Sequence, residues 1–286
     1  MKIARFEGGA GPQIGIVKGD KIVALSELGI KVSDMIELIE AGPPLLAEIT
    51  ENLDHCEAEA GQPLSAVRLL APLRPRKFLG LGMNYKRHAD EARRLGIAVP
   101  DNQLWFNKQT SCINDPFGEI EPGVTERLDY EVELGVVIGP SAKSVKAADA
   151  HSHIFGYIVV NDVSARDWQF HTTTITMGKS FDTHGPIGPW IVTADEIEDP
   201  ETLGIRCFVN GEKRQDSNTR DFIHPIAAQI EYLSTAFTLE PGDILATGTP
   251  EGVGVAMQPP VFLQPGDIVR CEIDRIGTIE NKVARR

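Results

Sequence analysis

The sequence is poor in cysteine and in positive charge. Its four cysteines, Cys56, Cys112, Cys207 and Cys271, lie far apart with no C-x-x-C pair, which argues against a zinc site and against a disulfide framework. Only 28 lysines and arginines face 41 acids, giving a formal net charge of −13. Such a field is unfavourable for nucleic acid or an anionic membrane. We therefore expect a small-molecule partner and reduced thiols in the cytoplasm.

Long apolar runs and several common catalytic motifs are absent as well. No segment approaches the about 18 apolar residues of a membrane span, and the first thirty residues lack the apolar core of an export signal. The segment 178–180 imitates the end of a phosphate-binding loop, but the required glycine is replaced by Thr173. The segment 80–82 lacks the third glycine of a dinucleotide fingerprint, and no G-x-S-x-G is present. These absences argue against a nucleotide-binding enzyme and a serine hydrolase.

The N-terminal part of the chain predicts a small mixed domain. Residues 14–25 alternate around a Lys-Gly-Asp turn, which indicates a hairpin. Asp34 with Glu37 resembles a capping box that opens a short helix ending near Gly42. A second helix is expected from Pro44 to about Ala60.

A proline-rich connector follows. Two prolines in 71–76 disfavour helix, so we place a domain boundary there, between a small N-terminal domain over residues 1–70 and a catalytic domain over residues 76–286. Hydrophobic residues make up 42% of the chain, which is enough for a substantial core.

The rest of the chain is predicted to be mostly sheet. Apolar runs of strand length recur at 78–81, 132–138, 154–160, 187–192, 205–209, 244–246 and 268–273. The clearest helix runs from Asp221 to about Thr238, and its apolar stripe is expected in the core: Ile226, Ile230, Leu233 and Phe237. The fold class is therefore α+β and rich in β-structure.

Three acids are candidate ligands for one metal ion. Glu131 and Glu133 lie two positions apart in an apolar run, so in a strand they share one face. Asp162 closes a second such run. Two carboxylates on a covered face repel each other and favour a cation between them, although a solvated strand face gives the same pattern. Carboxylate oxygens suit Mg²⁺, Mn²⁺ or Ca²⁺, so the expected metal is hard and divalent.

Other polar residues each allow two interpretations. His88 and Glu91 are about one helical turn apart, so a carboxylate-oriented imidazole could act as a general base, but such pairs also occur on ordinary surface helices. Lys179 is either a site residue or a solvated loop lysine. Thr249 lies in a segment, 246–254, whose glycines permit close approach to a ligand or simply form turns.

From about Arg76 onward the sequence resembles the fumarylacetoacetate hydrolase family. The resemblance rests on these segments in the expected order: Gly80–Tyr85 with His88 and Glu91, Asp129–Gly135, Asn161–Asp167, Gly178–Phe181 and Gly248–Gly254. Segments 105–111 and 248–266 are similar to the branch that acts on 2,4-diketo-3-deoxy sugar acids and acylpyruvates. This resemblance implies a mixed β-roll catalytic domain, a bound Mg²⁺ and a homodimer or higher homo-oligomer.

The resemblance also implies roles for individual residues. Glu131, Glu133 and Asp162 would bind the metal, with Mn²⁺ or Ca²⁺ as alternatives to Mg²⁺. The remaining roles are catalytic for His88, Glu91 and Lys179, and substrate-binding for Gln169, Thr249 and Tyr85. The segment from Asn84 to about Cys112 resembles a mobile lid that is disordered until substrate binds.

The expected activity is hydrolysis of a carbon–carbon bond in a 2,4-dioxo acid to pyruvate and a carboxylic acid. The narrowest prediction is cleavage of 2,4-diketo-3-deoxy-L-rhamnonate to pyruvate and lactate. Oxaloacetate decarboxylation, isomerisation of 2-hydroxyhepta-2,4-diene-1,7-dioate and non-catalytic oxo-acid binding are the alternatives, because the fold alone does not separate them. The His88–Glu91 pair favours hydrolysis, since decarboxylation needs no nucleophile.

Overall fold

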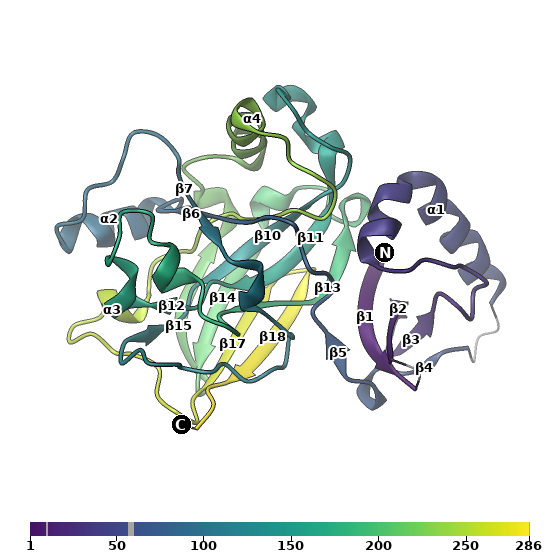
Figure 1. The fold of residues 1–286 in the computed structure, drawn as a ribbon, viewed down its shortest axis with the longest axis horizontal. Coiled ribbons are helices and arrows are strands. Elements are labelled where there is room, and N and C mark those ends of the chain that lie inside the picture. The colour runs from purple at the N-terminus through teal and green to yellow at the C-terminus, as the bar shows by residue number, and fades with distance from the viewer. Residues whose placement is uncertain (10, 57–59, 286) are drawn as a thin grey trace.

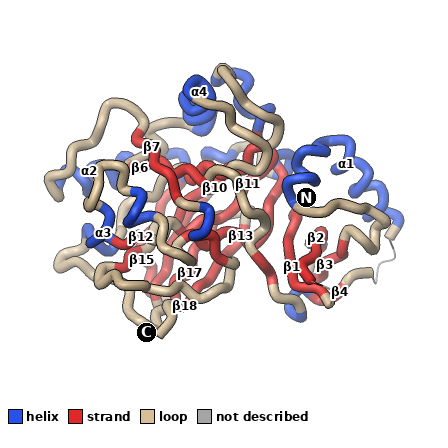
Figure 2. The backbone as a smooth tube through the Cα atoms, viewed as in Figure 1, coloured by secondary structure: helices blue, strands red, loops and turns tan. Residues whose placement is uncertain are grey.

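A computed structural model describes the chain except for residues 10, 57–59 and 286. Figure 1 shows an N-terminal lobe, coloured purple, beside a larger lobe that contains most of the strands. Figure 2 shows the strands running through the middle of the larger lobe with helices at its periphery. One sheet of twelve strands passes through both lobes in the order β4-β3-β2-β1-β13-β11-β10-β16-β6-β7, with β5 paired to β1 and β8 to β13.

The N-terminal lobe contains a hairpin and a broken helix, as the sequence predicts. Its elements are β1 (Lys2–Gly8), β2 (Gly11–Lys18), β3 (Lys21–Ala24), α1 (Met35–His55), β4 (Gln62–Pro63) and β5 (Leu69–Leu70). The predicted hairpin is confirmed, since β2 and β3 pair with Lys18 opposite Lys21. Asp34 caps α1 by accepting a hydrogen bond from the Glu37 amide at 2.9 Å.

Helix α1 is interrupted at Gly42, whose φ of 64° lies in the left-handed region that glycine tolerates best. The two predicted helical segments are therefore confirmed. The second segment ends at His55, earlier than predicted, and residues 57–59 of the predicted extension lie outside the described residues.

Five of the predicted apolar runs form strands of the large sheet. Its remaining strands are β6 (Phe78–Gly82), β7 (Leu104–Lys108), β8 (Ile113–Asn114), β10 (Val132–Ile138), β11 (Ile154–Asn161), β13 (Gly185–Thr193) and β16 (Ile244–Ala246). Every residue of β10 and β11 is buried, which explains why these two strands are apolar without alternation. Because β1 pairs with β13, the predicted boundary at 71–76 lies between segments that share one sheet and remains a prediction.

A second sheet of four strands packs in the larger lobe in the order β15-β14-β17-β18. Its strands are β14 (Gly204–Val209), β15 (Glu212–Asn218), β17 (Ile268–Ile273) and β18 (Gly277–Lys282), and a separate short pair joins β9 (Leu128–Asp129) to β12 (Ser164–Ala165). Tyr157 of β11, Ile205 of β14 and Ile279 of β18 share one apolar cluster, so the two sheets enclose a common core. Strand β15 was not predicted from the sequence, because its residues are polar and show no apolar alternation.

Three shorter α-helices lie in the described part of the larger lobe: α2 (Lys86–Arg94), α3 (Arg166–Gln169) and α4 (Ile226–Ala236). Helix α4 begins later than predicted, after Pro225, and buries Ile226, Ile230 and Leu233. The prediction that Phe237 is a core residue is wrong, because the helix ends before it and its side chain is exposed. Within the described part of the chain, no helix combines the length and apolarity that crossing a bilayer requires.

Candidate active site

The three acids predicted to bind a metal meet at one end of β10 and β11. Glu131 directly precedes β10, Glu133 lies within it, and Asp162 directly follows β11. The two strands are antiparallel neighbours, and the Asp162 amide donates to the Glu131 carbonyl at 2.8 Å. One carboxylate oxygen from each acid lies within 4.8 Å of the others, and all three residues are buried. The alternative of a solvated strand face is therefore wrong.

Two buried cations hold the acids in place. Lys179 Nζ contacts Glu131 Oε2 at 2.7 Å and Asp162 Oδ2 at 2.6 Å. Arg166 Nη2 contacts the other oxygen of Glu131 at 2.7 Å, while Arg166 also reaches Asp129 at 2.9 Å. The alternative of Lys179 as a solvated loop residue is wrong, because its side chain is 2% exposed.

A third buried cation, Lys108, was not singled out from the sequence. Its Nζ contacts Asp162 Oδ1 at 2.6 Å and donates to the carbonyl oxygens of Lys179 and His184. Lys108 ends strand β7, and its partner Asp162 is 54 positions away along the chain. No local spacing marks such a pair. We call these six residues the cavity floor: Lys108, Glu131, Glu133, Asp162, Arg166 and Lys179.

The floor carries an uneven charge. Burial alone would raise the pKa of Glu131, but the charges of Lys179 and Arg166 outweigh it, so this pKa is well below its usual range. Burial, together with the charges of Asp162 and Glu131, raises the pKa of Glu133 well above its usual range. Glu133 accepts one hydrogen bond from the Gly248 amide, at 2.8 Å. A divalent cation would relieve this repulsion, so three clustered carboxylates of this kind fit a hard metal.

The glycine-rich segment 246–254 supports the site from one side. The amides of Gly248, Gly252 and Gly254 donate to Glu133, Glu91 and Asp129, respectively, at 2.8, 3.0 and 2.8 Å. Gly248 has a φ of 103°, and a Cβ atom there would lie 2.6 Å from the side chain of Asn84. A side chain at this position would therefore displace the amide that holds Glu133. The segment is more than a simple turn.

The predicted His88–Glu91 pair forms on α2. His88 Nδ1 lies 3.1 Å from Glu91 Oε2, and the other oxygen of Glu91 accepts the Gly252 amide hydrogen bond. Both side chains are largely shielded, 15% and 12% exposed, so the pair is not an ordinary surface contact. With Nδ1 donating to the carboxylate, Nε2 is the nitrogen that can exchange a proton.

The His88–Glu91 pair and most of the floor residues line one cavity of about 230 Å³. Its lining includes His88, Glu91, Glu131, Glu133 and Lys179. This volume is below the roughly 300–1,000 Å³ of pockets for drug-sized ligands, so the cavity suits a small metabolite. The cavity therefore brings a metal-binding floor and a candidate base to one small ligand.

The predicted substrate-binding residues are placed differently. Gln169 and Thr249 line the cavity, and Thr249 Oγ1 donates to the Val132 carbonyl at 2.9 Å. Tyr85 does not line it: its ring is fully buried and packs edge-on against Phe222 with centroids 5.0 Å apart. Tyr85 thus packs in the core, and its role as a substrate contact stays a prediction.

The proposed lid is anchored at its two ends. Asn84 is buried and donates to the Thr247 carbonyl at 2.7 Å. At the other end, β7 pairs with β6 in the large sheet and carries buried Lys108. The segment that remains for lid motion lies between them, around α2, and its disorder without substrate stays a prediction.

Comparison with known proteins identifies related sequences and folds. A family model described as fumarylacetoacetate (FAA) hydrolase C-terminal matches residues 77–284, and one described as Rv2993c-like, N-terminal, matches residues 1–72. The mitochondrial oxaloacetate tautomerase of Xenopus laevis is 41% identical over 292 residues, covering 99% of this chain and 90% of that protein.

Solved structures agree with these sequence matches. The fumarylacetoacetate hydrolase of Exiguobacterium antarcticum has a TM-score of 0.85 at 35% identity, and all of both chains is covered. A maleylpyruvate hydrolase from Sphingobium, solved with manganese(II) and pyruvate, has a TM-score of 0.82 at 33% identity and covers 99% of each chain. The buried acidic cluster and these matches together show that this chain belongs to the fumarylacetoacetate hydrolase family.

Proposed function

We propose that this protein is a metal-dependent enzyme that interconverts the keto and enol forms of oxaloacetate or a closely related 2-oxo acid. The observation that carries the proposal is that one small cavity is lined by Glu131 and Glu133 of the acid cluster and by the His88–Glu91 pair. The identity of 41% to an oxaloacetate tautomerase along 99% of the chain supports this substrate class.

The metal would be held by Glu131, Glu133 and Asp162. We propose Mg²⁺, with Mn²⁺ or Ca²⁺ as alternatives, since the donors are all carboxylate oxygens. When bound, such an ion polarises a carbonyl oxygen as a Lewis acid. Manganese(II) in the maleylpyruvate hydrolase structure supports a divalent ion in a related fold.

Proton transfer is assigned to His88. The keto and enol forms differ in the position of one proton, so one base that takes it from carbon or oxygen and returns it to the other completes the reaction. Glu91 orients the ring through Nδ1, and its own second oxygen is fixed by the Gly252 amide. Lys179 and Gln169, which also line the cavity, would stabilise negative charge that develops on the substrate oxygen.

Hydrolytic cleavage of a 2,4-dioxo acid to pyruvate and a carboxylic acid is the second candidate. The same His88–Glu91 geometry favours it, because a carboxylate-oriented imidazole can also deprotonate water. The likeness to a maleylpyruvate hydrolase supports this candidate. For 2,4-diketo-3-deoxy-L-rhamnonate the support is weaker, since much of the cavity is lined by apolar side chains that offer few partners to hydroxyl groups.

One assay panel separates these activities. Purified protein is given enol-oxaloacetate, acylpyruvates, 2,4-diketo-3-deoxy sugar acids and 2-hydroxyhepta-2,4-diene-1,7-dioate, with Mg²⁺ and again with excess EDTA. Metal-dependent loss of enol absorbance without pyruvate or carbon dioxide supports the tautomerase. Pyruvate with an equimolar acid indicates hydrolysis, carbon dioxide indicates decarboxylation, and absence of any turnover with measurable oxo-acid binding would overturn an enzymatic role.

We also propose a homodimer or higher homo-oligomer in the cytoplasm. The family resemblance supports the assembly, and the free cysteines support a reducing compartment. Light scattering after size-exclusion chromatography tests the assembly.

A further inference from the structure

The cations that line the cavity differ in what they contact. Lys179 is engaged by Glu131 and Asp162, and Arg166 by Asp129, Glu131 and Gln169. Arg127 also lines the cavity, but among the described residues its guanidinium makes no hydrogen bond or ion pair. Burial raises the pKa of Asp167, but hydrogen bonds from Thr125 and from the Glu126 amide lower it overall. The charge of Arg127 also lowers this pKa, by less than those hydrogen bonds do.

The backbone of Arg127 is fixed next to the cavity floor. Its carbonyl accepts a hydrogen bond from the Arg166 amide at 3.0 Å, and its amide donates to Thr125 Oγ1 at 3.1 Å. Arg127 directly precedes β9, whose Asp129 contacts both Arg166 and the Val255 amide. The Arg127 side chain is exposed to solvent, so the free protein does not bear the free-energy cost of a buried, unpaired charge.

The surrounding wall of the cavity is apolar. We call these residues the outer wall: Leu95, Ile97, Leu104, Phe170, Ile175 and Val255. Phe170 is 65% exposed and Leu95 is 45% exposed, so this wall lies towards solvent, while the floor is buried. Such a wall fits the carbon chain of a ligand and provides no partner for a charge at its far end.

We propose that Arg127 is a specificity residue that binds a second carboxylate at the distal end of the substrate. The proposal rests on the proposed function, in which the 2-oxo acid end of the ligand lies at the acid cluster. A guanidinium that lines the cavity, and that makes no hydrogen bond or ion pair with the described residues, matches a carboxylate through two parallel hydrogen bonds. The structure thus points to 2-oxo dicarboxylic acids as the preferred substrate class, over 2-oxo acids that end in a methyl group.

Binding of unreactive ligand pairs tests this inference without turnover. Isothermal titration calorimetry with Mg²⁺ compares 2-oxopentanedioate with 2-oxopentanoate, and 2-oxoheptanedioate with 2-oxoheptanoate. The two members of each pair differ only at the terminal group, which is a carboxylate in one and a methyl group in the other. Two chain lengths are used so that the distance from the 2-oxo acid group to the distal carboxylate is varied. We expect the dicarboxylate of at least one pair to bind about tenfold more tightly, the scale of one hydrogen bond to a charged group.

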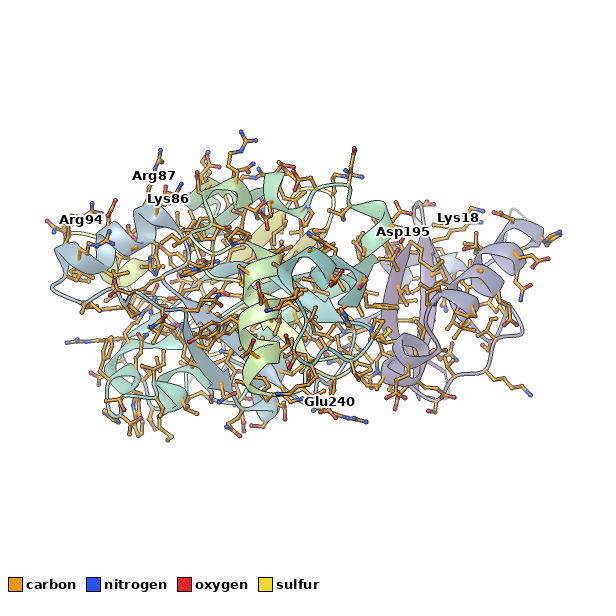
Figure 3. The ribbon with its side chains drawn as sticks, turned by 90° about the horizontal axis from the view of Figure 1, so that it is seen from above. Lys18, Lys86, Arg87, Arg94, Asp195 and Glu240 are labelled. Carbon is orange, nitrogen blue, oxygen red and sulfur yellow. The ribbon has the colours of Figure 1, made fainter. Side chains whose placement is uncertain are left out.

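Substitutions of Arg127 test whether this residue causes the preference for the dicarboxylate. Arg127→Met should reduce the larger ratio to below about twofold while leaving the affinity for the methyl-ended ligand unchanged, which shows that the cavity is intact. Arg127→Lys should retain part of the ratio, because lysine keeps the charge but not the two-pronged geometry. Arg94→Met is the matched control, since Arg94 is exposed on α2 and does not line the cavity (Figure 3).

Failure of the inference and failure of the proposed function give different results. Equal affinity of wild-type protein for both members of each pair, or a preserved ratio in Arg127→Met, overturns the role of Arg127 and leaves the 2-oxo acid site standing. Absence of binding by all four ligands, with Mg²⁺ and with Mn²⁺, overturns the proposed function and this inference together.

Discussion

The cavity floor and the outer wall are built in opposite ways. The floor joins charged residues from β7, β10, the end of β11 and the α3–Lys179 region, and the side chains of Lys108 and Asp162 are 0% exposed. The outer wall comes largely from the segment that follows α2 and the segment that follows α3, where Leu95 and Phe170 remain exposed. Buried charges persist only with partners, so the floor tolerates little change. The wall can vary, which separates the shared chemistry of the site from its choice of substrate.

The largest expected effect is on the floor. Lys108→Met should lower the free energy of unfolding by about 3–5 kcal/mol, because it leaves Asp162 Oδ1 and two carbonyl oxygens without their buried partner. Urea denaturation in EDTA measures the change. Lys86→Met, at an exposed position on α2, is the control. A loss below about 1 kcal/mol would show that the floor does not depend on this buried cation.

Substitutions in the His88–Glu91 pair are expected to lower turnover without changing metal affinity. His88→Ala should lower turnover at least about 100-fold, the usual minimum for a general acid–base residue, and leave Mn²⁺ affinity within about twofold. Glu91→Gln should cost less, because the imidazole remains and loses only its orientation. Steady-state kinetics and calorimetry provide the two readouts. Unchanged turnover in His88→Ala would remove this residue from the mechanism.

A smaller, pH-dependent effect is expected at Glu133. Its pKa in the folded state is raised above the ordinary 4.5, so the metal-free folded protein keeps a proton that the unfolded chain releases. Stability without metal should therefore fall as the pH rises above about 4.5. Glu133→Gln should remove this fall and stabilise the metal-free protein by on the order of 1 kcal/mol at neutral pH. It should also abolish the gain in melting temperature that Mn²⁺ gives the wild type.

Thermal unfolding of both proteins across pH, in EDTA and in Mn²⁺, measures these changes. Parallel pH profiles for wild type and Glu133→Gln in EDTA would contradict the assignment of a protonated, buried Glu133.

The smallest effect on stability is expected at the outer wall. Leu95→Ala should change the free energy of unfolding by less than about 0.5 kcal/mol, since this side chain is 45% exposed. In binding experiments, this substitution should weaken the affinity for 2-oxo acids with long carbon chains more than the affinity for those with short chains. A loss of more than about 1 kcal/mol in chemical denaturation would place Leu95 in the core and weaken the contrast between floor and wall.

Much of the fold could be predicted from local pattern. The apolar runs became strands of the two sheets, the Lys18–Gly19–Asp20 turn became a hairpin, and Asp34 capped α1. Phe237 was predicted to be buried because helical spacing continues to it, but the helix ends at Ala236. The polar strand β15 shows the converse limit, since a strand without apolar alternation has no local signal.

The candidate site was predictable where its residues are close in sequence. A period of two put Glu131 and Glu133 on one face, and helical spacing put His88 beside Glu91. For Tyr85, the motif could not show that the ring packs in the core beside Phe222.

The sequence by itself determined the apolar strands, the pairing of neighbouring acids and the short motifs of the family, because each depends on residues within a few positions of one another. Only the tertiary structure decided that Lys108 faces Asp162 and that Arg166 is engaged by the acids, while Arg127 lines the same cavity without an ion pair to any described residue. Those outcomes depend on which strands become neighbours and on how far each charge is removed from water. Neither property follows from a short stretch of chain, since burial and partners are supplied by segments distant in the sequence.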